Sequence, residues 1–167
     1  GIFWCDQMRG QVLKLEGGTT IRVISDVGMK DYFNDKLKDV NDIVGTWDEK
    51  KKEYNISMGY VTVPTQSFST GPRKSDSETN GGGILFSPKE TLSWNDSTKG
   101  WVSFKSFGPE LGVSLNNEYY TFNKGEIYQH HVTESVTGAT VLPNNFYGIQ
   151  GYSDVTLLFN DQPGSVK

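Results

Sequence analysis

The sequence has few of the residue types that carry covalent, redox or metal chemistry. It contains one cysteine, Cys5, and two histidines, His130 and His131. A single thiol makes neither an internal disulfide nor a cysteine-based zinc site. A Gly-rich phosphate loop and a nucleophile elbow are also missing from the sequence. We therefore expect no catalytic residue, no cofactor and no metal site, and we do not expect an enzyme.

Charge of one sign and long apolar runs are also scarce. The formal net charge is −4, from 16 basic and 20 acidic residues, and the basic residues are scattered through turns. A nucleic-acid-binding protein gathers them on one face, so we expect no sequence-specific nucleic-acid binding. No apolar run approaches the length that crosses a bilayer, and we expect no membrane span. Because the chain starts with Gly1 and stops at Lys167, we expect a processed product or a piece of a longer polypeptide.

The rare residues themselves have simple structural interpretations. Cys5 lies beside Trp4 on an expected strand, where a free cysteine acts as a small buried hydrophobic residue. His130 and His131 are neighbours, and neighbouring residues on a strand point to opposite faces. We therefore expect one imidazole to pack inward and the other to face solvent, rather than both to bind one metal ion.

What the sequence does contain favours strands and turns. It has 19 glycines, 8 tyrosines, 9 phenylalanines and 4 tryptophans, but few alanines and no heptad pattern. We predict an all-β fold of serial antiparallel hairpins, in a β-propeller-like or stacked-sheet architecture. At 167 residues the chain is long enough for a single β-rich domain, or for part of a larger propeller-like domain.

Four segments share one pattern, in which an aromatic or apolar strand, a polar turn and a second apolar strand follow one another. A hairpin of this kind does not bury its apolar face alone, so the hairpins must stack on each other. The expected hairpins join residues 2–5 to 11–15, 46–47 to 53–57, 91–94 to 101–104, and 119–122 to 126–130.

The remaining ordered segments include one helix. Alternation predicts further strands over residues 21–25 and 153–159. Residues 101–107 carry apolar side chains on both sides, which predicts a strand with both faces covered. Apolar residues recur at helical spacing over 29–40, which predicts one short helix there. Residues 108–112 are expected to form a turn.

The stretch over residues 64–83 differs from the rest because Ser, Thr, Gly and Pro dominate it. We expect a flexible Gly/Ser-rich insertion loop between strands. Within it, residues 76–81 carry oxygen-bearing side chains at alternate positions, as the start of a calcium-binding loop does. The twelfth position is Ser87, where a calcium loop needs a bidentate glutamate, so a plain flexible loop is favoured.

Tryptophans and paired carboxylates are the features that would suit a binding or catalytic role. Exposed tryptophans stack on sugars, but three of the four occupy strand ends before a turn, where packing between hairpins is favoured. Asp48 and Glu53 are carboxylates of the type that cleave glycosidic bonds, yet they flank a lysine-rich turn and are expected to be solvated. The four tryptophans are Trp4, Trp47, Trp94 and Trp101.

Aromatic residues on the strands make up most of the expected core. Replacing Trp101 with alanine is expected to cost roughly 3–5 kcal/mol of folding free energy if the residue belongs to this core. The expected core residues are Trp47, Tyr54, Trp94, Trp101, Phe104, Phe107, Tyr120, Phe122, Tyr128 and Phe159.

Several short motifs, each only a strand or a turn, are specific as a set. They are Asp6 followed by GQV at 10–12, SDVGMKDYF at 25–33, GTWD at 45–48 with Glu53 and Tyr54, WVSFKSF at 101–107 with PE at 109–110, SLNN at 114–117 with Tyr120, and NFYG at 145–148. Together they resemble a segment of the tail muzzle, or nozzle, proteins of crAss-like and related marine short-tailed bacteriophages. The resemblance touches nearly the whole chain, and the loop over 64–83 looks like a variable insertion.

The resemblance implies a propeller-like segment of a much longer virion protein. It implies a ring of identical subunits around the channel through which DNA leaves the particle, with other phage tail proteins as further partners. It also implies location in the virion, and it carries over no catalytic residue. Our leading hypothesis is therefore a structural component of a bacteriophage tail.

Two other hypotheses belong to different classes of protein. One is a carbohydrate-binding or host-receptor module, in which the insertion loop and exposed tryptophans hold glycans of the host surface. Tryptophan fluorescence titrated with bacterial polysaccharides separates this module from a scaffold. The other is a glycan-cleaving enzyme, which requires a cleft with two facing carboxylates.

Overall fold

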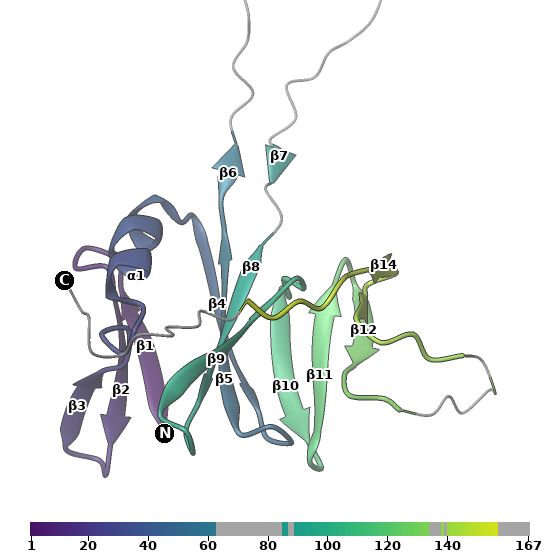
Figure 1. Ribbon diagram of the computed structural model, residues 1–167, viewed down its shortest axis with the longest axis horizontal. Coiled ribbons are helices and arrows are strands. Elements are labelled where there is room, and N and C mark those ends of the chain that lie inside the picture. Colours follow the sequence, from purple (N-terminus) through teal and green to yellow (C-terminus); the bar gives the residue numbers. More distant parts are fainter. Residues whose placement is uncertain (63–84, 87–88, 134–137, 139, 157–167) are drawn as a thin grey trace, which may run out of the picture. The chain divides into compact units, whose positions relative to one another are not determined.

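The computed structural model describes residues 1–62, 85–86, 89–133, 138 and 140–156 (Figure 1). Most of these residues lie in antiparallel strands, and the predicted all-β fold class is confirmed. The chain forms two compact units, residues 1–132 and 133–167. Within the described ranges, no helix is long and apolar enough to cross a membrane.

The first sheet is a three-stranded antiparallel meander. Its strands are β1 (Ile2–Asp6), β2 (Gln11–Glu16) and β3 (Thr20–Val23), paired in that order. The first predicted hairpin is therefore confirmed. Its turn ends at Gly10, which has φ +63 and whose Cβ, if present, would lie 2.5 Å from the Cα of Asn34. Only glycine meets both the conformation and the close approach.

One short helix follows the first sheet, as the apolar spacing predicts. It comprises α1 (Lys30–Lys36) and continues as a 3₁₀ turn, η1 (Leu37–Asp39). Phe33, Leu37 and Val40, spaced three or four residues apart, are buried on one side. Burying side chains of this size contributes roughly 1.5–3 kcal/mol each, which lets so short a helix persist.

The second sheet contains four strands from two of the predicted hairpins. It has the order β4 (Asp42–Asp48), β5 (Glu53–Gly59), β8 (Glu90–Asn95) and β9 (Gly100–Lys105), all antiparallel. We call it the central sheet. β5 and β8 are its inner strands, and β4 and β9 are its edges.

A β-bulge in the central sheet determines the face on which Trp101 of β9 lies. The register shifts between Ser93 and Trp94, so that Ser103 pairs with Ser93 while Trp101 pairs with Trp94. Strict alternation would have kept Trp101 and Ser103 on the same side. The extra residue brings both tryptophans to the apolar face, where their rings meet edge to face with centroids 5.6 Å apart.

The third sheet is another three-stranded meander, with strands β10 (Leu111–Leu115), β11 (Glu118–Asn123) and β12 (Glu126–Gln129). The fourth predicted hairpin, β11 with β12, is confirmed. β10 joins β11 through Asn116 and Asn117, both at positive φ, as a two-residue hairpin turn requires. The turn expected before this sheet is shorter than predicted, because its last two residues already belong to β10.

Two small hairpins complete the described strands. One pairs β6 (Val61–Thr62) with β7 (Leu85–Phe86) in the unit 1–132. The other pairs β13 (Asn145–Phe146) with β14 (Ile149–Gln150) in the unit 133–167. Neither was expected as a hairpin from the sequence.

Some predictions fall partly or wholly on residues that the structure does not describe. The insertion loop at 64–83, its calcium-like stretch at 76–81 and Ser87 lie outside the described residues. The strand predicted over 153–159 does not form over 153–156, and its remaining residues also lie outside.

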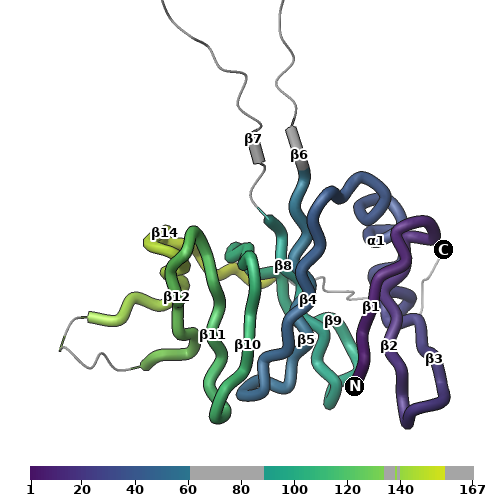
Figure 2. The backbone as a smooth tube through the Cα atoms, turned by 180° about the vertical axis from the view of Figure 1, so that it is seen from behind, coloured from purple at the N-terminus to yellow at the C-terminus, as the bar shows by residue number. Residues whose placement is uncertain are grey.

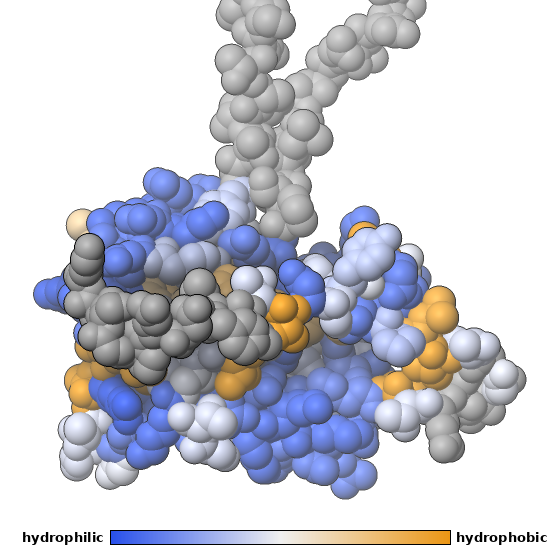
Figure 3. Space-filling model, in the orientation of Figure 1, coloured by the Kyte–Doolittle hydropathy of each residue, from blue (hydrophilic) through white to orange (hydrophobic). Residues whose placement is uncertain are grey.

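Within the unit 1–132, the sheets are layered on the two faces of the central sheet. The first sheet and α1 cover one face, and the third sheet covers the other (Figure 1, and Figure 2 from behind). The described sheets of this unit form an open stack, without the ring closure of a complete propeller. Hydrophilic residues, blue in Figure 3, cover most of the described surface in that view, in keeping with a mean hydropathy of −0.51.

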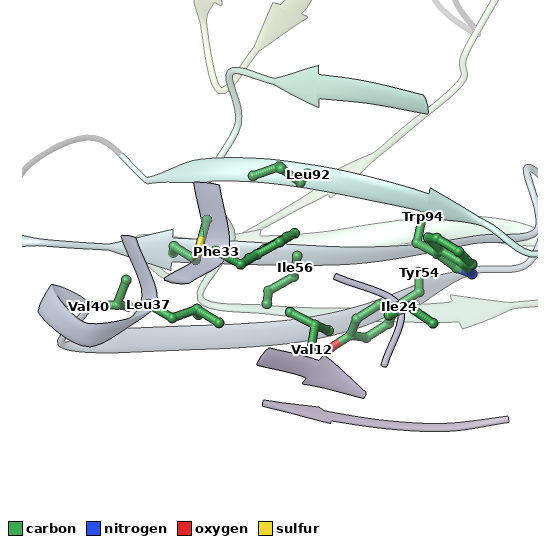
Figure 4. Packing of buried hydrophobic residues seen from close by; sticks show 10 residues of the cluster. Val12, Ile24, Phe33, Leu37, Val40, Tyr54, Ile56, Leu92 and Trp94 are labelled. Carbon is green, nitrogen blue, oxygen red and sulfur yellow. The ribbon is translucent and has the colours of Figure 1, made fainter. Parts of the chain in front are cut away.

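The main hydrophobic core lies between the central sheet and the layer formed by the first sheet and α1 (Figure 4). Its buried members come from β2, α1, β5 and β8 and from the segments beside them. They are Val12, Ile24, Phe33, Leu37, Val40, Tyr54, Ile56, Met58, Leu92 and Trp94.

The aromatic residues predicted for the core differ in how far they are buried. Tyr54, Trp94 and Phe107 are buried as predicted, and Trp47 and Trp101 are half-buried and pack on the core. Tyr120, Phe122 and Tyr128 are only half-buried, and Phe159 lies outside the described residues.

The prediction that β9 has both faces covered is wrong. Phe104 is 62% exposed, and Val102 is also exposed. β9 is an edge strand, so neighbouring side chains reach Phe104 from one side only. The ring of Phe104 meets Tyr32 edge to face at a centroid distance of 5.6 Å.

Candidate functional site: a polar layer between two sheets

Polar side chains cover the face of the central sheet that is turned toward the third sheet. Because successive residues of a strand point to opposite faces, Asn55 and Ser57 of β5 share this face with their partners on β4 and β8. Residues of the third sheet and of the segment after β12 meet them there. We call this set the polar layer: Thr46, Asp48, Asn55, Ser57, Thr91, Ser93, Tyr119, Thr121, His130 and His131.

Asp48 is the most buried charged group of the layer, with 0% of its surface exposed. One carboxylate oxygen lies 2.5 Å from Nε2 of His131, and the other accepts the backbone N–H of Lys51 at 3.0 Å. Burial alone raises the pKa of Asp48, but the two hydrogen bonds, together with the charges of His131 and Lys105, outweigh it and hold the pKa below its usual value. The expectation that Asp48 is solvated is wrong, because the third sheet covers this end of β4.

The prediction for the histidine pair is half right. His130 packs inward and is 6% exposed, whereas His131 is only half-buried. Instead of facing solvent freely, His131 forms an ion pair with Asp48 whenever its ring is protonated. The backbone of His131 has φ +60, which turns the chain at the end of the third sheet.

His130 occupies an aromatic pocket within the polar layer. Its ring centroid lies 4.7 Å from that of Phe107 and 5.0 Å from that of Tyr119. Its Nε2 forms a hydrogen bond with the Thr121 hydroxyl at 2.7 Å. Burial, helped by the nearby positive charge of His131, lowers the pKa of His130 to about 4. The ring is therefore neutral near pH 7.

A second group of hydrogen bonds connects β4 with the third sheet. The hydroxyls of Thr46 and Tyr119 lie 2.7 Å apart, so one donates to the other. Ser114 of β10 donates to the carbonyl of Trp47 at 2.7 Å and accepts the N–H of Glu49 at 3.0 Å. Gly112 makes this approach possible, because a Cβ there would lie 2.7 Å from Cγ2 of Thr46.

A row of hydroxyls and amides continues the layer across β5 and β8. Ser57 and Thr91 share a hydrogen bond of 2.6 Å, and Ser93 donates to Oδ1 of Asn55 at 2.5 Å. Thr91 also donates to the carbonyl of Phe107. Nδ2 of Asn55 is the buried atom of this row that has no hydrogen-bond partner. Because an unpaired buried polar group is costly, the remaining hydrogen bonds matter for the stability of the row.

Lys105 of β9 ends the row with a charge. Its ammonium group donates to a carboxylate oxygen of Glu53 at 2.8 Å and to Oδ1 of Asn55 at 3.0 Å. Asp48 and Glu53, the pair considered from the sequence as possible glycosidase carboxylates, are neighbours in the sheet register. Asp48 is hydrogen-bonded to His131 and Glu53 to Lys105, so neither carboxylate is left open to a substrate.

The arrangement contains elements of acid–base chemistry but little access to them. A carboxylate paired with an imidazole, as in Asp48 with His131, is the usual support for a general base. The hydroxyl of Thr121, which is hydrogen-bonded to the His130 imidazole, is completely buried. Among the described residues, no group of three or more His, Cys, Asp or Glu side chains is placed to hold a metal ion.

The tryptophans and Cys5 lie outside the polar layer. Trp94 is buried, and Trp47 and Trp101 pack on the core, as the packing interpretation predicts. Trp101 also donates from its indole N–H to the carbonyl of Ile24 at 3.0 Å. Cys5 is half-buried against the core, and burial raises the pKa of its thiol to about 11.

Sequence reasoning did not find the polar layer. Asp48 and His131 are 83 residues apart, and Thr46 and Tyr119 are 73 apart. Alternation of polar Glu53, Asn55 and Ser57 with apolar residues predicts one polar face of β5, but the same pattern describes a face covered by solvent. Comparisons of this chain with protein-family models, with curated proteins and with solved structures find no match.

Proposed function

We propose that the protein is a structural component of a bacteriophage tail, part of the muzzle ring around the DNA exit channel. The observation that carries the structural role is the burial of the polar layer. Its Asp48, His130 and hydroxyl groups bind one another across two sheets instead of lining an open site. Groups placed in this way join layers into a rigid body.

The phage tail as the setting is supported by the motif set described above. The structure places several of those motifs in the contacts that hold the layers together. Asp48 of the GTWD motif is bound by His131, and Trp101 of the WVSFKSF motif packs on Phe33 of the SDVGMKDYF motif with ring centroids 4.7 Å apart. Ser114 of the SLNN motif bridges to β4. In this chain, residues of these motifs therefore form contacts between the layers.

Location in the tail is tested on phage particles whose genome encodes the chain. Antibodies raised against the protein should label purified virions at the tail end when examined by immunogold electron microscopy. Mass spectrometry of the same particles should find peptides of the chain and show its parent polypeptide. Purified particles without label and without peptides would refute the proposal.

The glycan-binding alternative is tested by tryptophan fluorescence. Three of the four tryptophans pack on or in the core, so a scaffold should show no saturable change with bacterial polysaccharides. Trp4 of β1, which is half-buried and not part of the core, is the residue most able to report a bound sugar. A saturable response that Trp4→Ala removes would favour the glycan-binding module over the scaffold.

A further inference from the structure

The open stack of the unit 1–132 ends in two apolar sheet faces. The outer face of the first sheet, which we call end face A, consists of the residues that alternate with the core-facing Phe3, Cys5 and Val12. Its apolar members are Ile2, Trp4, Leu13, Leu15, Ile21 and Val23. Ile2 and Ile21 are exposed, and the other four are half-buried.

The third sheet has the corresponding outer face at the opposite end of the stack. We call it end face B, and its residues alternate with those that point into the polar layer, such as Tyr119 and Thr121. Its apolar members are Leu111, Val113, Leu115, Tyr120, Phe122 and Ile127. The four aliphatic residues are exposed, and the two aromatic residues are half-buried.

The two end faces match in size and in chemistry. Each belongs to a three-stranded meander and carries six apolar side chains. Each also carries one acidic residue at its margin, Asp6 on face A and Glu118 on face B. Arg9 neutralises Asp6 and Lys50 neutralises Glu118 within the same chain. Neither face therefore presents an unpaired charge from this acid to a partner.

The geometry points to a second copy of this chain as the occupant, with face A of one copy packed on face B of the next. This inference rests on the proposed structural role. Within the chain, the three sheets already stack in one direction, since the inner face of the first sheet meets the central sheet and the opposite face of the central sheet meets the third. Packing face B on face A of a neighbour continues that stack. One contact then covers an apolar face of each copy.

The size of the faces sets the strength of the contact. Three strands about 4.8 Å apart and five residues of about 3.3 Å each give an outline of roughly 250 Å². A standard interface buries about 800 Å² on each partner. One pair of end faces is therefore weak, and association is expected near or above about 10 µM rather than in the nanomolar range. A closed ring, in which every copy makes two contacts, is correspondingly more stable.

Two substitutions test the head-to-tail contact in the full chain. Ile21→Lys places a charge on face A and Val113→Lys places one on face B, at residues that are 60% and 46% exposed. Both lie on edge strands, so the fold tolerates them. Met8→Lys, at a 90% exposed residue in the turn between β1 and β2, adds the same charge outside both faces and is the control.

Sedimentation velocity should be measured from about 10 µM to about 1 mM. The unaltered chain and Met8→Lys are expected to associate as concentration rises, whereas each face variant weakens association at least about tenfold, since a lysine must be desolvated. An equimolar mixture of the two face variants should form dimers that grow no further, because only one intact face of each remains. Circular dichroism confirms that each variant keeps its strands.

Other outcomes overturn the inference in distinguishable ways. Association of Val113→Lys alone, but not of Ile21→Lys, shows that face A pairs with face A. A monomer at every concentration shows that copies of the chain do not pair through these faces and overturns the inference. Either result leaves the tail proposal intact if virions still carry the label. If virions carry no label but the mixed variants form the expected dimers, the phage-tail proposal is refuted and the head-to-tail contact is supported.

Discussion

At the scale of single residues, burial of charge and hydroxyl groups is the distinctive property of this protein. Asp48, Thr121 and Asn55 are completely buried, although polar side chains of these types are mostly found at the surface. Partners offset the cost of burying Asp48 and Thr121, namely His131 and His130, whereas Asn55 is paired through Oδ1 and its Nδ2 has no hydrogen-bond partner. Loss of one partner leaves the other unpaired in a dry environment, so each contact matters more than a surface contact of the same geometry.

Acid should destabilise the protein in two steps that belong to different residues. The pKa of His130 is about 4 when folded and near 6.5 when unfolded, so the unfolded chain binds the extra proton first as pH falls. Stability is complete above about pH 6.5 and falls by about 3 kcal/mol down to about pH 4. The lowered pKa of Asp48 adds stability that is present above the unfolded value and is lost as pH falls through the folded value.

Urea unfolding at a series of pH values measures this dependence. His130→Gln, which keeps a polar side chain beside Thr121 but does not titrate, should flatten the curve between about pH 6.5 and about pH 4. The loss of stability at lower pH should remain, because Asp48 is unchanged. An identical slope in the variant and the unaltered chain between those pH values would contradict the assignment to His130.

Gly112 should not accept a side chain, for reasons of space alone. A Cβ there would lie 2.7 Å from Cγ2 of Thr46 and 3.2 Å from the Tyr119 hydroxyl, so β10 would have to move away from β4. We expect Gly112→Ala to lower the free energy of unfolding by roughly 1–3 kcal/mol. Gly100→Ala is the matched control, since its nearest contact would be 3.9 Å, and should change stability little. Chemical denaturation of both variants measures the difference, and equal denaturant midpoints would contradict the predicted clash at Gly112.

At the scale of secondary-structure elements, β9 shows how an edge strand divides its aromatic residues. The bulge brings Trp101 onto the apolar face, where it contacts Trp94 and Phe33. Phe104 lies on the same strand but is largely exposed. Two large aromatic residues three positions apart therefore differ greatly in how much apolar surface they remove from water.

Replacing each of these two residues with alanine should show that the loss of folding free energy depends on how deeply the ring is buried, and not only on its being aromatic. Trp101→Ala is expected to cost roughly 3–5 kcal/mol, because it removes ring contacts and the hydrogen bond to the Ile24 carbonyl. Phe104→Ala should cost less than about 1 kcal/mol, since most of the ring is already in water. Denaturant midpoints of the two variants measure both values. Similar losses would show that Phe104 contributes as much packing as Trp101, contrary to its exposure.

At the scale of the whole unit 1–132, the two interfaces of the central sheet differ in kind. The interface with the first sheet and α1 is mainly apolar, and its ionic contacts include the pair of Lys14 on β2 with Asp96 beside β8, 2.5 Å apart. The interface with the third sheet contains Asp48, His130 and His131, with Lys105 and Glu53 beside them. The layers therefore respond differently to acid although they belong to one compact unit.

Hydrogen exchange should detect this difference directly. Lowering the pH from about 7 to about 4 should reduce the protection of amides in β10, β11 and β12 more than that in β5 and β8, after correction for intrinsic rates. His130→Gln should reduce the difference between the two groups. Equal loss of protection in all sheets would show that the stack opens only as a whole.

The local elements of this protein are predictable from patterns along the chain. The four hairpins, the helix after β3 and the all-β class follow from alternation, turn residues and helical spacing, which act between residues close in the chain. The apolar core positions Tyr54 and Trp94 follow from the same patterns. Each of these signals is local, so it is readable without knowing how the sheets meet.

Which polar face is buried, and which apolar faces stay exposed, depends on contacts between segments far apart in the chain. Asp48 and His131 meet across 83 residues, and nothing in the turn around Asp48 distinguishes a covered carboxylate from a solvated one. The same holds for Phe104, whose exposure depends on the position of β9 at the edge of its sheet. Alternation states that a strand has two different faces, whereas contacts between distant segments decide what covers each of them.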